Sequence, residues 1–153
     1  MKYYISEYNQ GTNVLPAELQ HEIEDVISTI TTKPAKGASE SLRKEALARL
    51  RSLGWSGEVQ VAQGSNITIT STKRRVGLCL QVGNVARIYA DMMKLQALYL
   101  NNTIMAAGIV VPSKSVALKL GGNLAQGDRL IRELEIFRKV YTVPTMIFEL
   151  EDL

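Results

Sequence analysis

The second half of the chain alternates between apolar strands and amphipathic helices. Residues 76–82 and 104–111 are apolar on both faces, which is typical of strands buried inside a parallel sheet. Helical spacing of apolar residues predicts helices over about 85–100 and 125–139, and a last strand over 143–149 closes the sheet. Because parallel neighbours are joined by crossover helices, this order predicts βαβ units and leaves few other architectures.

The first half predicts two helices followed by an antiparallel hairpin. Helices are expected over 16–31 and 39–53, where apolar side chains recur at helical spacing. Residues 58–61 and 67–70 alternate between apolar and polar around a turn that contains Gly64, which predicts a β-hairpin. A hairpin ahead of βαβ units makes the sheet mixed. The fold class is therefore α/β, with a mixed β-sheet core flanked by helices.

Composition excludes several classes of protein. The chain has 153 residues, the size of one domain, and no repeat or linker divides it, so a single domain over 1–153 is expected. One Cys and one His cannot build a disulfide framework or a conventional zinc site. The formal net charge of +3 is compatible with nucleic acid but too small to indicate it. Because no signal peptide or long apolar stretch is present, we expect a cytoplasmic protein without a membrane partner.

One stretch carries a specific motif. Residues 69–84 read Ile-Thr-Ser-Thr-Lys-Arg-Arg-Val-Gly-Leu-Cys-Leu-Gln-Val-Gly-Asn. This resembles the BglII-type restriction endonucleases, a branch of the PD-(D/E)xK nucleases, whose pattern is Ile-Asp, a basic turn, Val-Gly-Leu-Glu-x-Gln and Gly/Ser-Asn. Residues 5–9 and 143–152 are similar to the family's N-terminus and closing strand. The resemblance implies a restriction-endonuclease-like fold along the whole chain.

The departures from this pattern concern the catalytic positions. The family holds catalytic magnesium with the Asp and the Glu, and these positions carry Thr70 and Cys79 here. Only Gln81 is retained, at the place where more distant relatives have the catalytic Lys. Magnesium requires hard oxygen ligands, whereas a hydroxyl is a poor substitute for a carboxylate and a thiol is soft. We therefore expect no metal, no other cofactor, no small-molecule substrate and no intact catalytic residue.

Other residues near the motif allow two interpretations. Glu58-Val59-Gln60 repeats the family's Glu-x-Gln, but the position nine residues earlier holds Arg49, so we interpret the repeat as coincidence. Asp91 could point back toward the site, although its spacing to Lys94 favours an ordinary solvated ion pair. Cys79 is expected to be a small buried hydrophobe, with a reactive thiol as the alternative.

Basic side chains supply the candidates for DNA contact. Arg43 and its basic neighbours on the 39–53 helix coat one side of it, which favours a solvated face over phosphate contact. The resemblance places a basic turn near the scissile region, the segment after Gln81 near the bases, and the loop over 112–115 loosely near the major groove. The DNA-binding candidates are Lys73, Arg74, Arg75, Gly83, Asn84, Ser113 and Lys114.

Three functions follow from these observations. The first is a catalytically inactive homologue of a type II restriction endonuclease that binds duplex DNA as a homodimer, since the family acts as two-fold dimers on palindromic sites. The second is a protein–protein interaction module without DNA binding. The third is an active magnesium-dependent endonuclease whose acids have moved to other positions.

Overall fold

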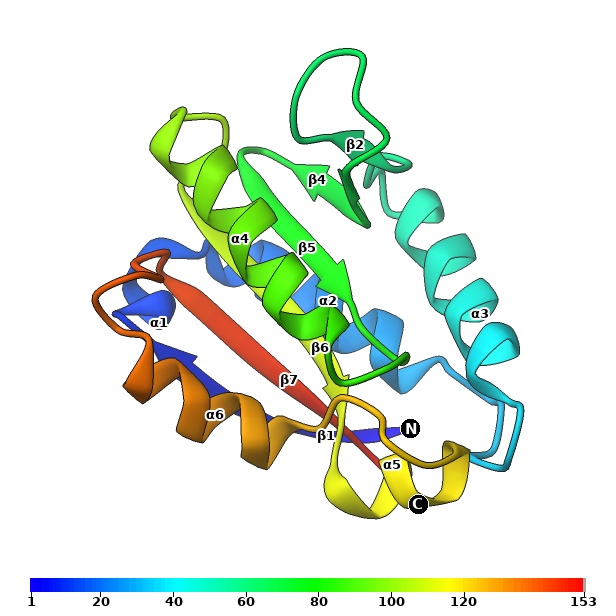
Figure 1. Cartoon of the computed structure of the whole chain (residues 1–153). Coiled ribbons are helices and arrows are strands. Elements are labelled where there is room, and N and C mark those ends of the chain that lie inside the picture. Colours follow the sequence, from blue (N-terminus) through cyan, green and yellow to red (C-terminus); the bar gives the residue numbers. More distant parts are fainter. Residues whose placement is uncertain (153) are drawn as a thin grey trace.

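The main sheet of the computed structural model has five strands and is mixed, which confirms the expected α/β class (Figure 1). The structure describes residues 1–152. Strand order is β1-β7-β6-β5-β4, with the three central strands parallel and the two edge strands antiparallel to their neighbours. The strands are β1 (Lys2–Tyr8), β4 (Ser71–Lys73), β5 (Val76–Leu80), β6 (Ala106–Pro112) and β7 (Thr145–Glu151).

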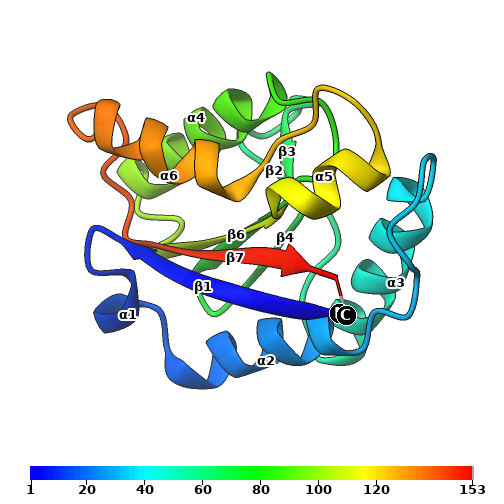
Figure 2. The same ribbon diagram turned by 90° about the horizontal axis from the view of Figure 1, so that it is seen from below.

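Helices cover both faces of this sheet (Figure 2). The helices are α1 (Gly11–Val14), α2 (Ala17–Ser28), α3 (Ser39–Ser52), α4 (Arg87–Leu100), α5 (Lys114–Leu120) and α6 (Gly127–Ile136). Apolar residues of α2 and α3 form one core layer, and those of α4 and α6 form the other. Because side chains alternate along a strand, Leu78 and Leu80 of β5 face the first layer while Cys79 faces the second.

A second, two-stranded sheet stands apart from the main one. Strands β2 (Val59–Gln60) and β3 (Thr68–Ile69) pair antiparallel, which confirms the hairpin expected over 58–61 and 67–70. The hairpin projects at the upper right of the molecule in Figure 1, beyond β4. It lies on the same side of the molecule as α3.

Three elements were not predicted. The N-terminal segment forms β1 and pairs with β7, so β7 does not close the sheet, contrary to the expectation for 143–149. Lys73 is the last residue of strand β4, and Arg74 and Arg75 form the turn that leads to β5. The expected loop over 112–115 is instead the end of β6 and the start of α5. Among residues 1–152, no helix is long and apolar enough to cross a membrane.

Candidate functional site

A cleft of about 580 Å³ opens at the carboxyl end of β5, between α3 and α4. The Gln81 backbone N–H donates to Val110 O of β6 at 2.8 Å, so Gln81 is still bonded to the sheet at the point where it lines the cleft. Thr70 and Gln81 both line it, together with Glu58 and Thr68 from the base of the projecting hairpin. The structure therefore brings two of the three family positions to one site.

The two positions that carry acids in the family pattern hold neutral, engaged side chains here. Thr70 is buried, and its Oγ1 accepts a hydrogen bond from Leu80 N at 3.0 Å. Cys79 is 1% exposed and packs in the α4–α6 core layer. Burial raises the pKa of the Cys79 thiol far above its usual range, and the nearby Asp91 carboxylate raises it further. Cys79 is thus the buried hydrophobe that the sequence favoured, because a thiol so strongly protonated is a poor nucleophile.

Asp91 lies inside the cleft, so its interpretation as a solvated surface residue was wrong. Its side chain is only 10% exposed, and Gln81 Nε2 donates to Asp91 Oδ2 at 2.6 Å. The expected partner Lys94 is present at 3.7 Å from Asp91 Oδ1. Burial raises the pKa of Asp91, against the lowering effects of the Gln81 hydrogen bond, Lys94 and Arg43. Asp91 is therefore a buried carboxyl group that binds the retained Gln81.

The amide of Gln81 is held at both ends. Its Nε2 binds Asp91, and its Oε1 accepts from Gly83 N at 3.1 Å. These two contacts fix both the plane and the orientation of the amide. Gln81 consequently has one defined arrangement in the cleft, set by a carboxylate from α4 and by the loop that follows β5.

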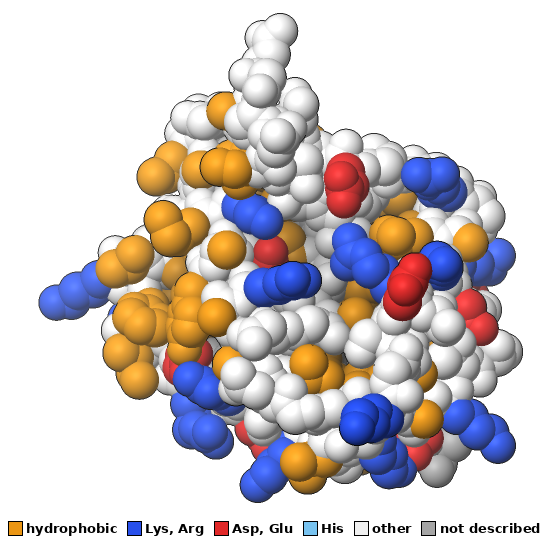
Figure 3. Space-filling model, turned by 45° about the vertical axis from the view of Figure 1, so that its right-hand side comes forward, with side chains coloured by type: hydrophobic (Ala, Val, Ile, Leu, Met, Phe, Trp, Pro, Cys, Tyr) orange, Lys and Arg blue, Asp and Glu red, His pale blue; other side chains and the backbone are white. Residues whose placement is uncertain are grey.

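Charges of both signs line the cleft. Arg43, Arg87 and Lys94 are its cations, and Arg43 Nη1 also donates to Leu80 O at 2.9 Å. Three carboxylates accompany them: Glu40, Glu58 and Asp91. Figure 3 shows this face with blue and red side chains interspersed around the hollow. The cleft is polar and nearly charge-balanced, and the basic coat of α3 takes part in it through Arg43.

The rest of that basic coat points elsewhere. Lys44 pairs with Glu40 at 3.0 Å on the exposed surface, which fits the expected solvated face. Arg49 pairs with Asp25 of α2 at 2.7 Å. Of Arg43, Lys44 and Arg49, Arg43 is the one that lines the cleft, where it could contact a phosphate. A basic helix face does not reveal from sequence which of its side chains borders a cleft.

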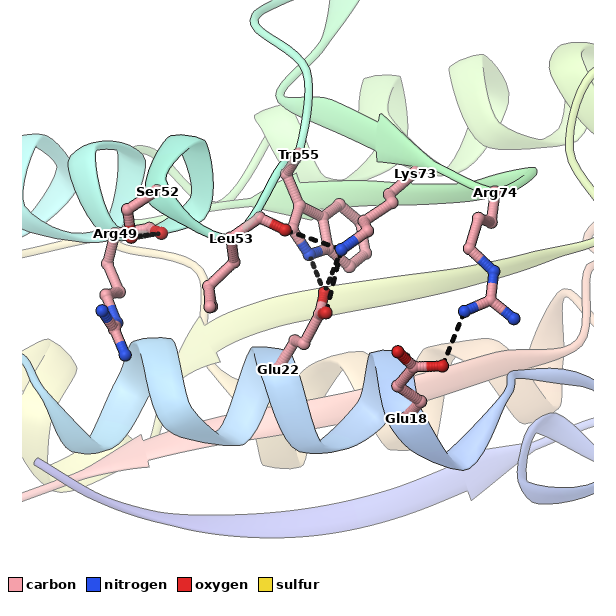
Figure 4. A network of polar contacts seen from close by, with 8 residues as sticks. All are labelled: Glu18, Glu22, Arg49, Ser52, Leu53, Trp55, Lys73 and Arg74. Atoms are coloured by element: carbon pink, nitrogen blue, oxygen red, sulfur yellow. Dashed lines mark hydrogen bonds and ion pairs between the residues drawn. The ribbon is translucent and has the colours of Figure 1, made fainter.

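The basic turn does not flank Thr70 and Gln81, which contradicts the placement expected from the sequence. In the β4–β5 register Lys73 faces Val76, so the turn lies about 16 Å along β5 from Gln81. Figure 4 shows Lys73 and Arg74 directed toward α2 instead. Lys73 Nζ binds Glu22 Oε1 at 2.8 Å and Leu53 O at 2.6 Å, while Arg74 Nη1 binds Glu18 Oε2 at 2.7 Å. These contacts join the β4–β5 turn to α2 and to the end of α3.

The turn itself is held in an uncommon conformation. Arg74 and Arg75 have φ values of 47° and 63°, the left-handed region that non-glycine residues rarely adopt. Two consecutive left-handed residues are the signature of a type I′ turn, whose twist matches that of the strands it joins. Arg75 Nη2 donates to Asn102 O at 3.0 Å. The turn is thus a structural connection, fastened at each of its basic residues.

The remaining DNA-binding candidates lie at the same edge of the sheet as the cleft. Gly83 lines the cleft, and Asn84 is exposed beside it, where its Oδ1 accepts from Ala86 N at 2.9 Å ahead of α4. Ser113 is buried as the N-cap of α5, its Oγ accepting from Val116 N at 3.3 Å. Lys114 follows it on the exposed surface. Ser113 therefore has a structural role that its place in the sequence did not reveal.

The donor set of the cleft does not fit magnesium. Among residues 1–152, no cluster of three or more His, Cys, Asp and Glu residues is arranged to hold a metal ion. Asp91 is the carboxylate next to Gln81, and it is already paired with Lys94. Thr70 and Cys79 offer a hydroxyl and a protonated thiol where a hard dication needs anionic oxygen.

Comparisons with known proteins identify the family and the fold of the chain. The sequence model of the BglII/BglIII restriction endonucleases matches residues 3–150, nearly the whole chain. The chain belongs to the BglII restriction endonuclease family. BglII bound to a 16-mer DNA superposes with a TM-score of 0.86 at 16% identity, covering 100% of this chain and 79% of BglII. Free BglII gives a TM-score of 0.76 at 16% identity, with 100% and 81% covered. No curated protein sequence matches the chain.

Membership in the BglII family directs attention to Thr70 and Cys79, the positions expected from the sequence motif to correspond to the family's acids. The structure places them beside each other, with the Cys79 thiol against the Thr70 backbone. The family fold is therefore present, and Thr70 lies in its cleft with the buried Cys79 behind it.

Proposed function

We propose that this chain is a catalytically silent member of the BglII family that binds duplex DNA as a homodimer. The observation that carries the proposal is the state of the two acid positions. The Thr70 hydroxyl is bonded to the backbone of β5, and Cys79 is a buried, protonated thiol. Neither side chain can replace the charge of a metal-binding carboxylate.

Loss of the metal removes the chemistry of phosphodiester cleavage. Magnesium supplies hydroxide near neutral pH and stabilises the charge that develops on the phosphoryl group. Gln81 has no proton that titrates in water, and its amide is occupied by Asp91 and Gly83. The cleft can therefore orient a phosphate through its cations, but the retained Gln81 cannot activate water.

The capacity to bind DNA is supported by the fold and by the cleft cations. The matched BglII structure contains a DNA 16-mer, and this chain has the same fold along its full length. Arg43, Arg87 and Lys94 line the cleft and can neutralise phosphates. Asn84 and Lys114 are exposed at the same sheet edge. We assign DNA contact to this face, and not to the Lys73–Arg75 turn.

A fluorescence-anisotropy titration of a short duplex at several salt concentrations tests this assignment. The wild type should bind at low ionic strength, and log K should fall linearly with log salt. Arg87→Ala or Lys94→Ala should each reduce the slope by about 0.9, because each removes one phosphate contact. Lys44→Ala on α3 and Arg75→Ala on the turn are matched controls and should leave it unchanged. No salt-dependent binding by the wild type would contradict the proposal and favour a protein–protein module.

The homodimer is expected to form through an exposed apolar patch on α4 and the segment after α6. The residues that line the patch are Tyr89, Met92, Met93, Gln96, Ala97, Leu100, Phe137, Val140 and Tyr141, of which Met92 and Tyr141 are buried. Met93 is 73% exposed, and Leu100 and Val140 are each 70% exposed. Apolar side chains gathered this way are typical of an interface. Because Arg87 and Lys94 lie on α4 too, a two-fold contact here would hold two clefts on one assembly.

Analytical ultracentrifugation tests the dimer. Wild type should sediment as a dimer at micromolar concentration, and Met93→Glu/Leu100→Glu should sediment as a monomer, since four buried charges in a two-fold interface have no partners. Leu118→Glu, at a residue 71% exposed on α5, is the matched control and should stay dimeric. A monomeric wild type, or a dimer that survives the double change, would rule out this interface.

A nuclease with relocated acids is a second candidate because Asp91 lies in the cleft beside Gln81. Under the main proposal, supercoiled plasmid stays intact with the wild type in magnesium or manganese. Metal-dependent cutting that Asp91→Asn abolishes would establish the second candidate instead.

A further inference from the structure

The β2–β3 hairpin projects from the rim of the cleft. Glu58 and Thr68 at its base line the cleft, and the loop between the strands extends away from the main sheet. Figure 3 shows it as a tall projection at the top of this face, without red or blue side chains at its tip. A segment placed here would meet any duplex that lies along the cleft.

Its composition differs from that of the rest of the chain. Charged residues make up 22% of the sequence, yet none occurs between Glu58 and Lys73. The exposed side chains of the loop are uncharged and mostly polar. A hairpin without lysine or arginine adds no charge attraction to phosphates, and it can enter a groove without charge repulsion from the backbone.

The loop has a defined shape. Val61 N donates to Ile67 O at 2.8 Å, and Ser65 N donates to Ala62 O at 3.0 Å. Gly64 has a φ of 79°, and its N–H donates to Gln60 Oε1 at 3.2 Å. The side-chain oxygen of Gln60 and the backbone N–H of Ser65 are therefore both occupied by hydrogen bonds within the turn. Among the described residues, the exposed amides of Gln63 and Asn66 have no hydrogen-bond partner within the chain, so both are free for a ligand.

We propose that the tip of this hairpin reads base edges in a groove of the bound duplex through Gln63 and Asn66. This inference rests on the proposed DNA binding and adds to it the residues that select sequence. A two-stranded ribbon fits the major groove, which is about 12 Å wide, and a Gln or Asn amide pairs with the N6/N7 edge of adenine. The cleft cations supply affinity, and the hairpin supplies discrimination.

The test selects ligands from a randomised duplex pool and then measures each protein on the enriched duplex and on a scrambled one. Wild type should prefer the enriched duplex. Gln63→Ala/Asn66→Ala should lose this preference by about 10-fold to 100-fold while keeping the same salt slope and the same affinity for the scrambled duplex. Asn13→Ala, an exposed amide on α1, is the control and should behave as wild type.

The outcomes separate the two proposals. A double variant that keeps its preference overturns the base-reading role, and so does one that weakens on both duplexes equally, because that is a general contact. Wild type that binds duplexes without enriching any sequence overturns the hairpin inference alone. Wild type that binds no duplex overturns the proposed function and the inference together.

Discussion

Thr70→Asp/Cys79→Glu should give this protein a magnesium site and detectable cleavage of duplex DNA. The Cys79 side chain lies against the Thr70 backbone and near Asp91, so two introduced carboxylates would stand beside an existing one. Three like charges in a buried site repel one another and raise their own pKa values. A divalent cation relieves this repulsion, and it supplies the hydroxide and the charge stabilisation that the cleft lacks.

The stability of the double variant should depend on the metal. Without magnesium it should be less stable than wild type by several kcal/mol, because an unpaired charge is introduced at Cys79, which is 1% exposed. Magnesium at about 100 times its Kd should restore about 2.7 kcal/mol. In a chain of this size that is a rise in Tm of roughly 5–10 °C, measurable by calorimetry or circular dichroism.

The neutral counterpart Thr70→Asn/Cys79→Gln is the matched control, since it introduces the same shapes without charge. It should show no response to magnesium and no plasmid cleavage. Each single variant should respond weakly, because one added carboxylate leaves the coordination incomplete. A folded charged double variant whose Tm ignores magnesium would refute the idea that these two positions alone removed metal binding.

The order of the central elements was predictable because burial leaves a periodic trace in the sequence. Residues 76–82 and 104–111 were expected as buried strands, and the structure has β5 and β6 there with small differences at the ends. β1 was missed because an edge strand with one exposed face carries polar and aromatic residues that show no strong period. α5 was missed because seven residues make barely two turns.

Only those site residues that belong to one continuous sequence motif could be predicted from the sequence. Thr70, Cys79 and Gln81 follow from the motif. The structure brings Thr70 and Gln81 to the cleft and buries Cys79 against the Thr70 backbone in the α4–α6 core layer. Lys73 is three residues from Thr70, but an extended strand separates them and the turn lies at the other end of β4 and β5. Asp91 and Lys94 are three residues apart, and this spacing does not show whether an ion pair on a helix is exposed or buried. Only the packing of α4 against β5 shows that Asp91 faces Gln81.

Asp91→Asn should strengthen DNA binding and remove the part of its pH dependence that comes from the Asp91 carboxyl group, whose pKa is raised by burial. Asp91 is an internal anion in a cleft whose cations are Arg43, Arg87 and Lys94. It competes with phosphate for Lys94, 3.7 Å away, and asparagine keeps the hydrogen bond from Gln81 while removing the charge. Lys94 contacts phosphate in both proteins, so the salt slope should stay close to that of wild type while the affinity rises. Affinity should rise at least about fivefold, the equivalent of ~1 kcal/mol for a charge pair near 4 Å in water.

The sign of the pH dependence follows from the raised pKa of Asp91. Burial favours the protonated acid in the folded protein, so the folded state binds this proton more tightly than the unfolded chain does. Stability therefore falls as pH rises from the unfolded pKa through the folded one, and stays at the lower level above both. Wild type should bind DNA more tightly as pH falls through the same window, because protonation removes the competing anion.

Anisotropy titrations at several pH values check the predicted DNA binding, and urea unfolding at the same pH values checks the predicted stability. Glu40 and Glu58 are further carboxyl groups of the cleft, so the difference between wild type and Asp91→Asn isolates the contribution of Asp91. Asp25→Asn, at a half-exposed residue paired with Arg49 outside the cleft, should match wild type in DNA affinity. If Asp91→Asn instead weakened binding at every pH, Asp91 would be a positioning residue that holds Gln81 and Lys94 for the ligand, because the loss of a competitor cannot lower affinity.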